Sequence, residues 1–208
     1  SHTGDRRMKG HAERISLIVL AAGKSSRFGS NKLLMKLNGE TLIRRVVRKG
    51  LESRADEVVV VAGYEAEKIA EALKDLHCRL VLNPAFEKGQ SSSVVAGVRF
   101  VRSHAKAAMI LPADMPFLEV ADIDRVIDEF NCSGASLVAA SYEGRIGHPI
   151  LFGVKLFDEV LRIKEETFGL KEIVRRYHDK MKLAETGSRG VLVDVDVPGD
   201  FERLGAGI

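Results

Sequence analysis

The chain has 208 residues, which is enough to bury a full hydrophobic core without disulfide bonds. Its 32 lysines and arginines nearly balance its 29 aspartates and glutamates, and the net charge of +3 gives no case for a nucleic-acid partner. No apolar run approaches the ~20 residues of a membrane span, so we expect no membrane partner. Cys78 and Cys132 match neither a zinc pattern nor a secreted disulfide framework, so we expect a cytoplasmic protein.

The first 14 residues are polar and basic and lack the apolar core of a signal peptide. We interpret residues 1–14 as a leader or an expression remnant and expect them to be disordered. The rest of the chain shows no internal repeat, no low-complexity segment and no linker long enough to mark a domain boundary. We therefore predict a single domain over residues 15–208.

Short apolar runs alternate with amphipathic stretches along this domain. Continuous β-branched and aliphatic runs are typical of strands covered on both faces. The predicted strands are residues 15–20, 57–61, 79–83, 107–111, 135–141 and 191–197. The predicted helices are one that begins after Thr41 and others over residues 64–76, 91–102, 121–130, 155–162, 168–177 and 199–204, with no element assigned to 144–153.

This alternation of strands with helices of about ten to fifteen residues indicates βαβ units and a mostly parallel sheet. The first predicted helix supports the pattern, because Thr41 is a typical N-cap and Leu42, Val46 and Val47 share one face. The fold class is therefore α/β, and ligands are expected at the carboxyl ends of the strands.

A loop rich in glycine, serine and cations follows the first strand, in the stretch LAAGKSSRFGSNK at residues 20–32. The small side chains of Ala21, Ala22 and Gly23 leave the backbone open to a flat ligand such as a nucleobase with its ribose. Neither a Walker loop nor a dinucleotide fingerprint fits, since the lysine that closes the stretch follows its second glycine by three residues.

Three cations of this loop, Lys24, Arg27 and Lys32, surround amides that could form an anion nest and wrap a triphosphate. We expect them to be exposed and to contribute little to stability. The alternative is a solvated loop with ordinary surface cations, which is disfavoured because a buried strand leads directly into it.

Acidic residues follow two later strands. Asp114 in LPADMP comes directly after a buried strand, and opposite a triphosphate its expected task is to bind Mg²⁺, although a turn or helix cap is the alternative. Asp194 and Asp196 in VDVDVPGD share one face of the predicted strand. A divalent metal would explain two carboxylates on an apolar strand, and a solvent-facing edge strand is the competing interpretation.

A third polar loop lies in the stretch NPAFEKGQSSS, from Asn83 onward. Gly89 permits a tight turn, and Gln90, Ser91 and Ser92 offer compact donors and acceptors just before a helix. These side chains could read the edge of a base, and Ser91 could also cap the helix.

The chain resembles a known family in five motifs that occur in the family's order and approximate spacing: LAAGKSSRFGSNKLL, NPAFEKGQSSSVVAGV, LPADMP, GRIGHPILF and DVDVPGD. They are similar to those of the nucleotidyltransferases that contain molybdenum cofactor cytidylyltransferase (the MobA/MocA-like enzymes). The resemblance spans roughly Ile15 to Leu204. The first motif alone resembles a wide superfamily of nucleoside-triphosphate transferases, and the combination is narrower.

The resemblance implies a Rossmann-like, three-layer α/β/α nucleotidyltransferase fold that moves CMP from CTP to the terminal phosphate of molybdopterin and releases pyrophosphate. It implies Mg²⁺ between Asp114 and Asp196, catalytic roles for Arg27, Lys32 and Asp114, and a receiving molybdoenzyme as a further partner. The nucleotide-binding residues that it implies are Leu20, Ala21, Ala22, Gly23, Lys24, Arg27, Lys32, Asn83, Gly89, Gln90, Ser91 and Ser92.

The acceptor side departs from the family pattern. The resemblance places His148 on the pterin side, whereas a structural histidine beside Pro149 is the alternative. Lys171 in ETFGLK stands where the family's GDxGAR stretch has arginine, which puts the acceptor in doubt.

The metal motifs also depart from the family pattern. Ala113 replaces the usual glycine before the metal aspartate, and the terminal pattern DIDTPED reads DVDVPGD.

Three other functions stay open. Guanylyltransferases of the family tend to have glycine where Ala22 stands, which favours cytidine without excluding guanosine. A cytidylyl- or guanylyltransferase for another small phosphate-bearing acceptor would share the nucleotide residues. A non-catalytic nucleotide- or cofactor-binding chaperone would have less need of both metal carboxylates.

Overall fold

The computed structural model describes residues 14–24, 30–196 and 199. A seven-stranded sheet with the order β5-β4-β1-β6-β8-β7-β9 forms its centre. Only β8 runs antiparallel to its neighbours, and the other described strand pairs of this sheet are parallel. The strands are β1 (Arg14–Ala21), β4 (Glu57–Ala62), β5 (Arg79–Leu82), β6 (Ala105–Pro112), β7 (Leu137–Tyr142), β8 (Arg145–Gly153) and β9 (Lys182–Glu185), with a separate ribbon of β2 (Lys36–Leu37) and β3 (Glu40–Thr41).

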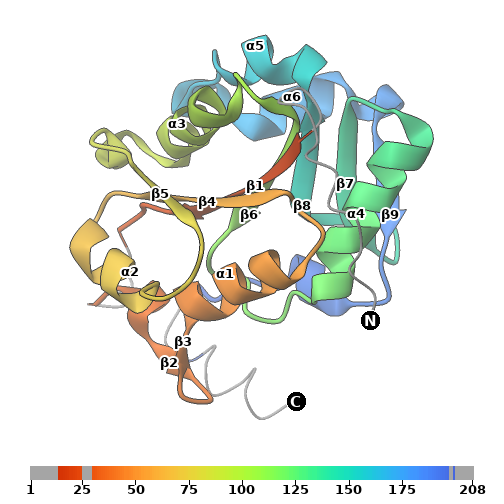
Figure 1. Ribbon diagram of the computed structural model, residues 1–208. Coiled ribbons are helices and arrows are strands. Elements are labelled where there is room, and N and C mark those ends of the chain that lie inside the picture. Colours follow the sequence, from red (N-terminus) through yellow and green to blue (C-terminus); the bar gives the residue numbers. More distant parts are fainter. Residues whose placement is uncertain (1–13, 25–29, 197–198, 200–208) are drawn as a thin grey trace.

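Helices cover both faces of the sheet, as Figure 1 shows. One layer contains α3 (Gln90–Val101), α5 (Phe157–Val160) and α6 (Leu170–Arg176). The other contains α1 (Leu42–Glu52), α2 (Ala66–Ala72) and α4 (Val120–Ser133). The predicted Rossmann-like α/β/α fold with a mostly parallel sheet is therefore confirmed. Short 3₁₀ turns complete it: η2 (Lys32–Leu34), η3 (Phe86–Lys88), η4 (Val154–Leu156), η5 (Glu165–Thr167), η6 (His178–Lys180) and η7 (Arg189–Leu192).

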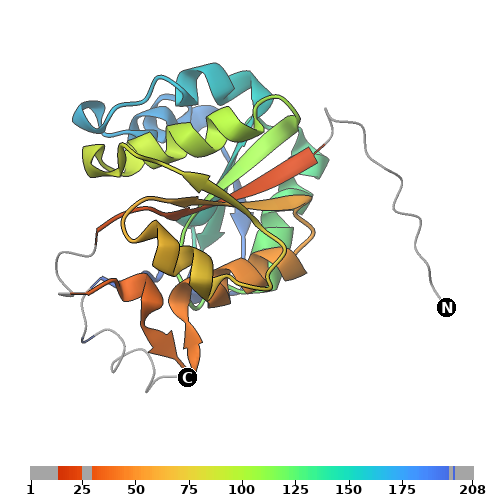
Figure 2. The same cartoon turned by 60° about the vertical axis from the view of Figure 1, so that its left-hand side comes forward.

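The central strand β1 is buried on both faces, which explains its continuous apolar sequence. Leu17 and Val19 pack in the core under α1 and α4, and Ile18 and Leu20 pack in the core under α3. The strand thus carries its carboxyl end rigidly to one side of the molecule. Figure 2 shows that η2 and the start of α3 lie on this same side.

Helix α1 begins where the sequence predicts. The hydroxyl of Thr41 accepts a hydrogen bond from the amide of Arg44 at 3.3 Å, and the helix buries Leu42, Val46 and Val47. The Thr41 cap and the buried apolar face therefore confirm the predicted start and orientation of this helix.

The strand predicted over 191–197 is wrong. The structure has η7 followed by an irregular run through Asp196, although Val195 is buried and Asp194 is exposed as alternation predicts. The amide of Val195 donates to the carbonyl of Asp114 at 2.8 Å, so this segment is fixed by the loop after β6. Valine and aspartate side chains thus alternate between buried and exposed, but the segment pairs with a loop and not with another strand.

Two strands of the seven-stranded sheet were not predicted, β8 and β9, and neither was the short ribbon of β2 and β3. Gly147 and Pro149 interrupt the apolar pattern of β8, and β9 is four residues long with only Ala184 buried. The helix predicted over 64–76 is shorter, because turns replace it after Ala72. The leader predicted over residues 1–14 is one residue too long, because Arg14 already belongs to β1. Residues 1–13 and all but the first residue of the helix predicted over 199–204 lie outside the described residues.

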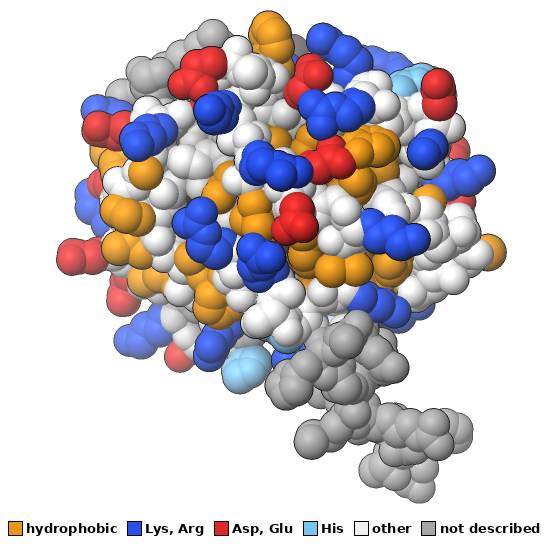
Figure 3. All heavy atoms as spheres, turned by 90° about the horizontal axis from the view of Figure 1, so that it is seen from above, with side chains coloured by type: hydrophobic (Ala, Val, Ile, Leu, Met, Phe, Trp, Pro, Cys, Tyr) orange, Lys and Arg blue, Asp and Glu red, His pale blue; other side chains and the backbone are white. Residues whose placement is uncertain are grey.

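The surface over α3, α5 and α6 carries both signs of charge. In Figure 3, lysine and arginine side chains are interspersed with aspartate and glutamate side chains across this face. Within the described part of the chain, none of the helices combines the length and the apolar composition needed to cross a membrane.

Candidate nucleotide site

A cavity of about 650 Å³ lies at the carboxyl ends of β1 and β6. It is lined by residues from the first loop, from the start of α3, from the end of β6 and from the segment after η7. The sequence-predicted residues among them are Leu20, Ala22, Gly23, Lys24, Lys32, Gly89, Gln90, Asp114 and Asp196. Sequence-distant motifs are thus brought to one site, at the edge of the sheet where α/β folds bind ligands.

Lys32 and Asp114 form the polar centre of this cavity. The ammonium of Lys32 lies 2.9 Å from Asp114 Oδ2 and donates a second hydrogen bond to the carbonyl of Val195 at 2.8 Å. Each side chain of the pair is only 18% exposed, so Lys32 is not the exposed surface cation that the sequence predicts. This lysine joins the loop after β1, the end of β6 and the segment after η7.

Opposing effects act on the pKa of the Asp114 carboxyl group. Burial raises its pKa above the usual value, the ammonium of Lys32 opposes this shift, and the carboxylate of Asp194 adds to it. A nearby cation therefore favours the ionised form of Asp114.

The donor set fits Mg²⁺. Asp114 and Asp196 both line the cavity, and Mg²⁺ characteristically takes one or two carboxylates together with phosphate oxygens and water. Among the described residues, no cluster of three or more His, Cys, Asp or Glu side chains could hold a metal without a substrate. A metal here would need the oxygens of a bound phosphate. Asp194 is exposed and does not line the cavity.

The start of α3 forms the opposite wall. The helix begins at Gln90 with Gly89 at the N-cap position, so the interpretation of Ser91 as N-cap is wrong. Gly89 has φ 103°, and an added Cβ would lie 2.4 Å from Glu165 Cγ, so the position requires glycine. The Ser91 amide instead donates to Glu165 Oε1 at 2.5 Å.

Asn83 and Ser92 organise this wall from behind and do not line the cavity. The amide nitrogen of Asn83 donates to Ser92 Oγ at 2.9 Å and to Ser93 Oγ at 3.0 Å. Ser92 Oγ has one proton to donate and lies 2.7 Å from the carbonyl oxygen of Gly89 and 3.1 Å from that of Ala85. Glu87, Gln90 and Ser93 are the polar residues of this loop and helix start that line the cavity.

Aromatic residues at the edge of the cavity were missed in the sequence. Phe86 lines the cavity and lies 6.3 Å from the ring of Tyr64, and the ammonium of Lys24 lies 5.6 Å above that ring. Phe86 belongs to the NPAF stretch, and an aromatic residue in such a loop is the signal that could have found it.

Among the described residues, Ala21 and Ser91 are two further predicted nucleotide residues that do not line the cavity. Ala21 packs in the core on the α1 side of the sheet and does not line the cavity. Arg27 lies outside the described residues. The predicted cation trio is therefore described only for Lys24 and Lys32.

The predicted acceptor residues lie outside this cavity, on β8 and α6. His148 is partly buried on β8, where burial lowers its pKa to about 4 and the charge of Asp194 opposes the shift. Lys171 is exposed on α6. Their roles toward an acceptor stay predictions.

The pKa of His148 predicts a pH-dependent stability. Below pH 6.5 the unfolded chain takes up a proton at this residue, whereas the folded chain does not until about pH 4, so the free energy of unfolding should fall between these values. At pH 5 the loss should be about 2 kcal/mol. Urea unfolding at pH 7 and pH 5 measures it, and His148→Gln should lose about that much less than wild type. Equal losses would show that His148 is not buried as a neutral imidazole.

Comparison with known proteins finds relatives over most of the chain. The family model of the MobA-like NTP transferase domain matches residues 17–181. The purine catabolism protein PucB of Bacillus subtilis is 30% identical over 195 residues, which are 90% of this chain and 94% of that protein. The molybdenum cofactor cytidylyltransferase of Escherichia coli is 26% identical over 188 residues, which are 90% of this chain and 93% of that protein.

A solved structure shares the fold. The crystal structure of Rv0371c from Mycobacterium tuberculosis H37Rv matches with a TM-score of 0.81 at 23% identity, over 94% of this chain and 99% of that chain. The likeness thus extends over nearly the whole architecture described above.

Proposed function

Because the chain belongs to the MobA-like NTP transferase family and is thus a nucleotidyltransferase, we propose that it moves CMP from CTP to the terminal phosphate of a molybdopterin acceptor. One observation carries the proposal: a single cavity gathers the loop after β1, the Lys32–Asp114 pair, Asp196 and the start of α3. The name of the Escherichia coli relative, molybdenum cofactor cytidylyltransferase, supports both cytidylyl transfer and a molybdenum cofactor acceptor.

The choice of base rests on the wall beside the first loop. Ala22 lines the cavity at the position where guanylyltransferases of the family tend to have glycine, which favours cytidine. Gln90 and Ser93 supply donors and acceptors for the edge of the base.

The proposed reaction is an in-line displacement at the α-phosphorus of CTP. An oxygen of the acceptor phosphate forms the new bond, the bond to the bridging oxygen of the β-phosphate breaks, and pyrophosphate leaves. The acceptor phosphate is already ionised at neutral pH, so the protein need not supply a nucleophile or a general base. Its work is to position the two phosphates and to neutralise their charge.

Lys32 would donate to phosphate oxygens, since its ammonium already faces the cavity beside Asp114. Mg²⁺ held by Asp114 and Asp196 would supply charge neutralisation at the phosphates when bound. The backbone of Gly23, which lines the same wall, is open to an approaching ligand.

Assays of pyrophosphate release with each of the four ribonucleoside triphosphates, with and without extracted molybdopterin, test the proposal. We expect release with CTP only when molybdopterin is present. Release with GTP alone among the triphosphates would assign a guanylyltransferase. Release with CTP and another phosphate-bearing acceptor, but not with molybdopterin, would reject the acceptor proposed here.

The base preference predicts a stability difference in the absence of any acceptor. CTP with Mg²⁺ should raise the melting temperature more than GTP or ATP does, because a ligand that binds the folded state stabilises it in proportion to its affinity. Differential scanning fluorimetry at equal triphosphate concentrations measures the shifts. Equal shifts for all triphosphates would show that the cavity recognises phosphate alone.

A further inference from the structure

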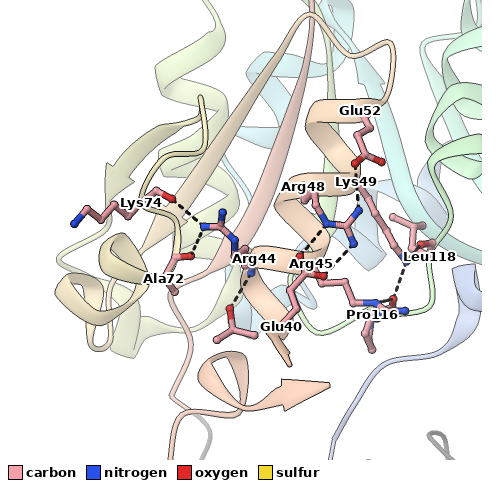
Figure 4. Close-up of polar contacts among 11 residues, drawn as sticks. Glu40, Arg44, Arg45, Arg48, Lys49, Glu52, Ala72, Lys74, Pro116 and Leu118 are labelled. Atoms are coloured by element: carbon pink, nitrogen blue, oxygen red, sulfur yellow. Dashed lines mark hydrogen bonds and ion pairs between the residues drawn. The ribbon is translucent and has the colours of Figure 1, made fainter. Parts of the chain in front are cut away.

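A lysine is buried under the loop that carries Asp114. Lys49, in the last turn of α1, is 9% exposed and donates hydrogen bonds to the carbonyls of Pro116 at 3.0 Å and Leu118 at 2.6 Å. Lysine is rarely buried this deeply, and burial lowers the pKa of Lys49 below its usual value. Figure 4 shows the side chain running from α1 to the loop after β6.

A second cation of α1 reaches the same loop. Arg45 lies one turn before Lys49, and its Nε donates to the carbonyl of Pro116 at 2.8 Å. Pro116 is buried and thus accepts hydrogen bonds from two cations of one helix. The turn at residues 116–118 is fastened to α1 directly after Asp114.

The same turn supports the segment that carries Asp196. An added Cβ at Gly190 would lie 2.0 Å from the carbonyl oxygen of Phe117, so η7 packs directly on the turn. Phe117 packs against the apolar cluster that contains Val195, and the Val195 amide donates to the carbonyl of Asp114 at 2.8 Å. Both aspartate-bearing segments therefore rest on residues 116–118.

We propose that Lys49, assisted by Arg45, is a positioning residue that sets the placement of Asp114 and Asp196 relative to a bound metal–triphosphate complex. The inference rests on the proposed function. Lys49 does not line the cavity, and it acts through the turn at residues 116–118.

The chain supplies a matched control on the same helix. Arg44 donates through Nη1 to two backbone carbonyls, those of Ala72 at 3.2 Å and Lys74 at 2.8 Å. In Figure 4 it leaves α1 on the opposite side from Lys49, toward the end of α2. Arg44 thus makes the same type of contact without touching either aspartate-bearing segment.

The test compares Lys49→Met with Arg44→Met by isothermal titration calorimetry. Methionine keeps much of the length of the lysine side chain but removes its donors. For Lys49→Met, the Kd of CTP saturated with Mn²⁺ should rise tenfold or more over wild type, and the Kd of CTP in EDTA should stay within twofold. For Arg44→Met, both Kd values should stay within twofold. Urea unfolding of both variants sets conditions in which each is fully folded.

A structural role alone would not single out the metal-dependent part of binding. If Lys49→Met binds Mn²⁺–CTP as Arg44→Met does, or if wild type binds CTP equally with Mn²⁺ and with EDTA, the inference is wrong. If Lys49→Met does not fold, Arg45→Met replaces it in the test. The Kd of Mn²⁺–CTP should then rise about threefold, and an unchanged Kd overturns the inference. Product formation with molybdopterin tests the proposed function separately, so either can fail without the other.

Discussion

Replacing Asp114 by asparagine should lower kcat for nucleotidyl transfer by 100-fold or more. The variant keeps the shape of the side chain but loses the negative charge that pairs with Lys32 and that would hold Mg²⁺. Steady-state kinetics with CTP and the acceptor measure the effect, and urea unfolding should show little loss of stability, because burial already penalises the charge of Asp114.

Asp194→Asn is the matched control for this prediction, since Asp194 lies outside the cavity but its charge still acts on Asp114. The kcat of Asp194→Asn should fall less than that of Asp114→Asn. The kcat of Asp196→Asn should fall at least tenfold, as expected for a lost metal ligand. Near-normal turnover in Asp114→Asn would remove the metal assignment and the reaction built on it.

Lys32→Met should lower kcat/KM for CTP by about 10- to 100-fold, because a hydrogen bond to a charged group contributes about 1.5 to 3 kcal/mol. It should also lower the free energy of unfolding by about 1 to 3 kcal/mol, since it leaves Asp114 buried without its ammonium and breaks the hydrogen bond to Val195. Kinetics and urea unfolding of the same preparation separate the two effects.

The control for Lys32 is Lys24→Ala. Lys24 also lines the cavity but is exposed, with its ammonium over the ring of Tyr64. We expect a loss in kcat/KM of less than tenfold and no measurable change in stability. If Lys24→Ala and Lys32→Met were both as active as wild type, the loop after β1 would not bind the triphosphate.

Much of this site could be predicted from the sequence because its residues directly follow buried strands. The loop after β1 and Asp114 after β6 are of this kind, and parallel strands bring their carboxyl ends to one edge. The segment of Asp196 also reaches the cavity, but not as the strand that was predicted. Its alternation of valine and aspartate indicates a strand, but the structure pairs Val195 with the Asp114 loop.

What the sequence could not show depends on contacts between distant residues. Glu165 accepts a hydrogen bond from the amide of Ser91, which lies 74 residues earlier in the chain. No local sequence pattern indicates that pairing. Lys49 lies in the run RRVVRK, which reads as the solvated face of an amphipathic helix. Whether such a lysine is buried depends on which loop packs over the helix. Strand β8 was missed because Gly147 and Pro149 are signals that usually end strands.

The carboxylate of Glu165 places a negative charge beside the first amides of α3, which form one side of the cavity. The first amides of a helix attract anions, but the Ser91 amide is already bound to this carboxylate, so a phosphate brought there would meet a negative charge. At the other side of the cavity, Lys24 and Lys32 lie with Asp114 and Asp196, and Mg²⁺ held by the two carboxylates would leave this side positive. Under the proposed function, a nucleotide would therefore be favoured with its base toward α3 and its phosphates toward β1 and η2.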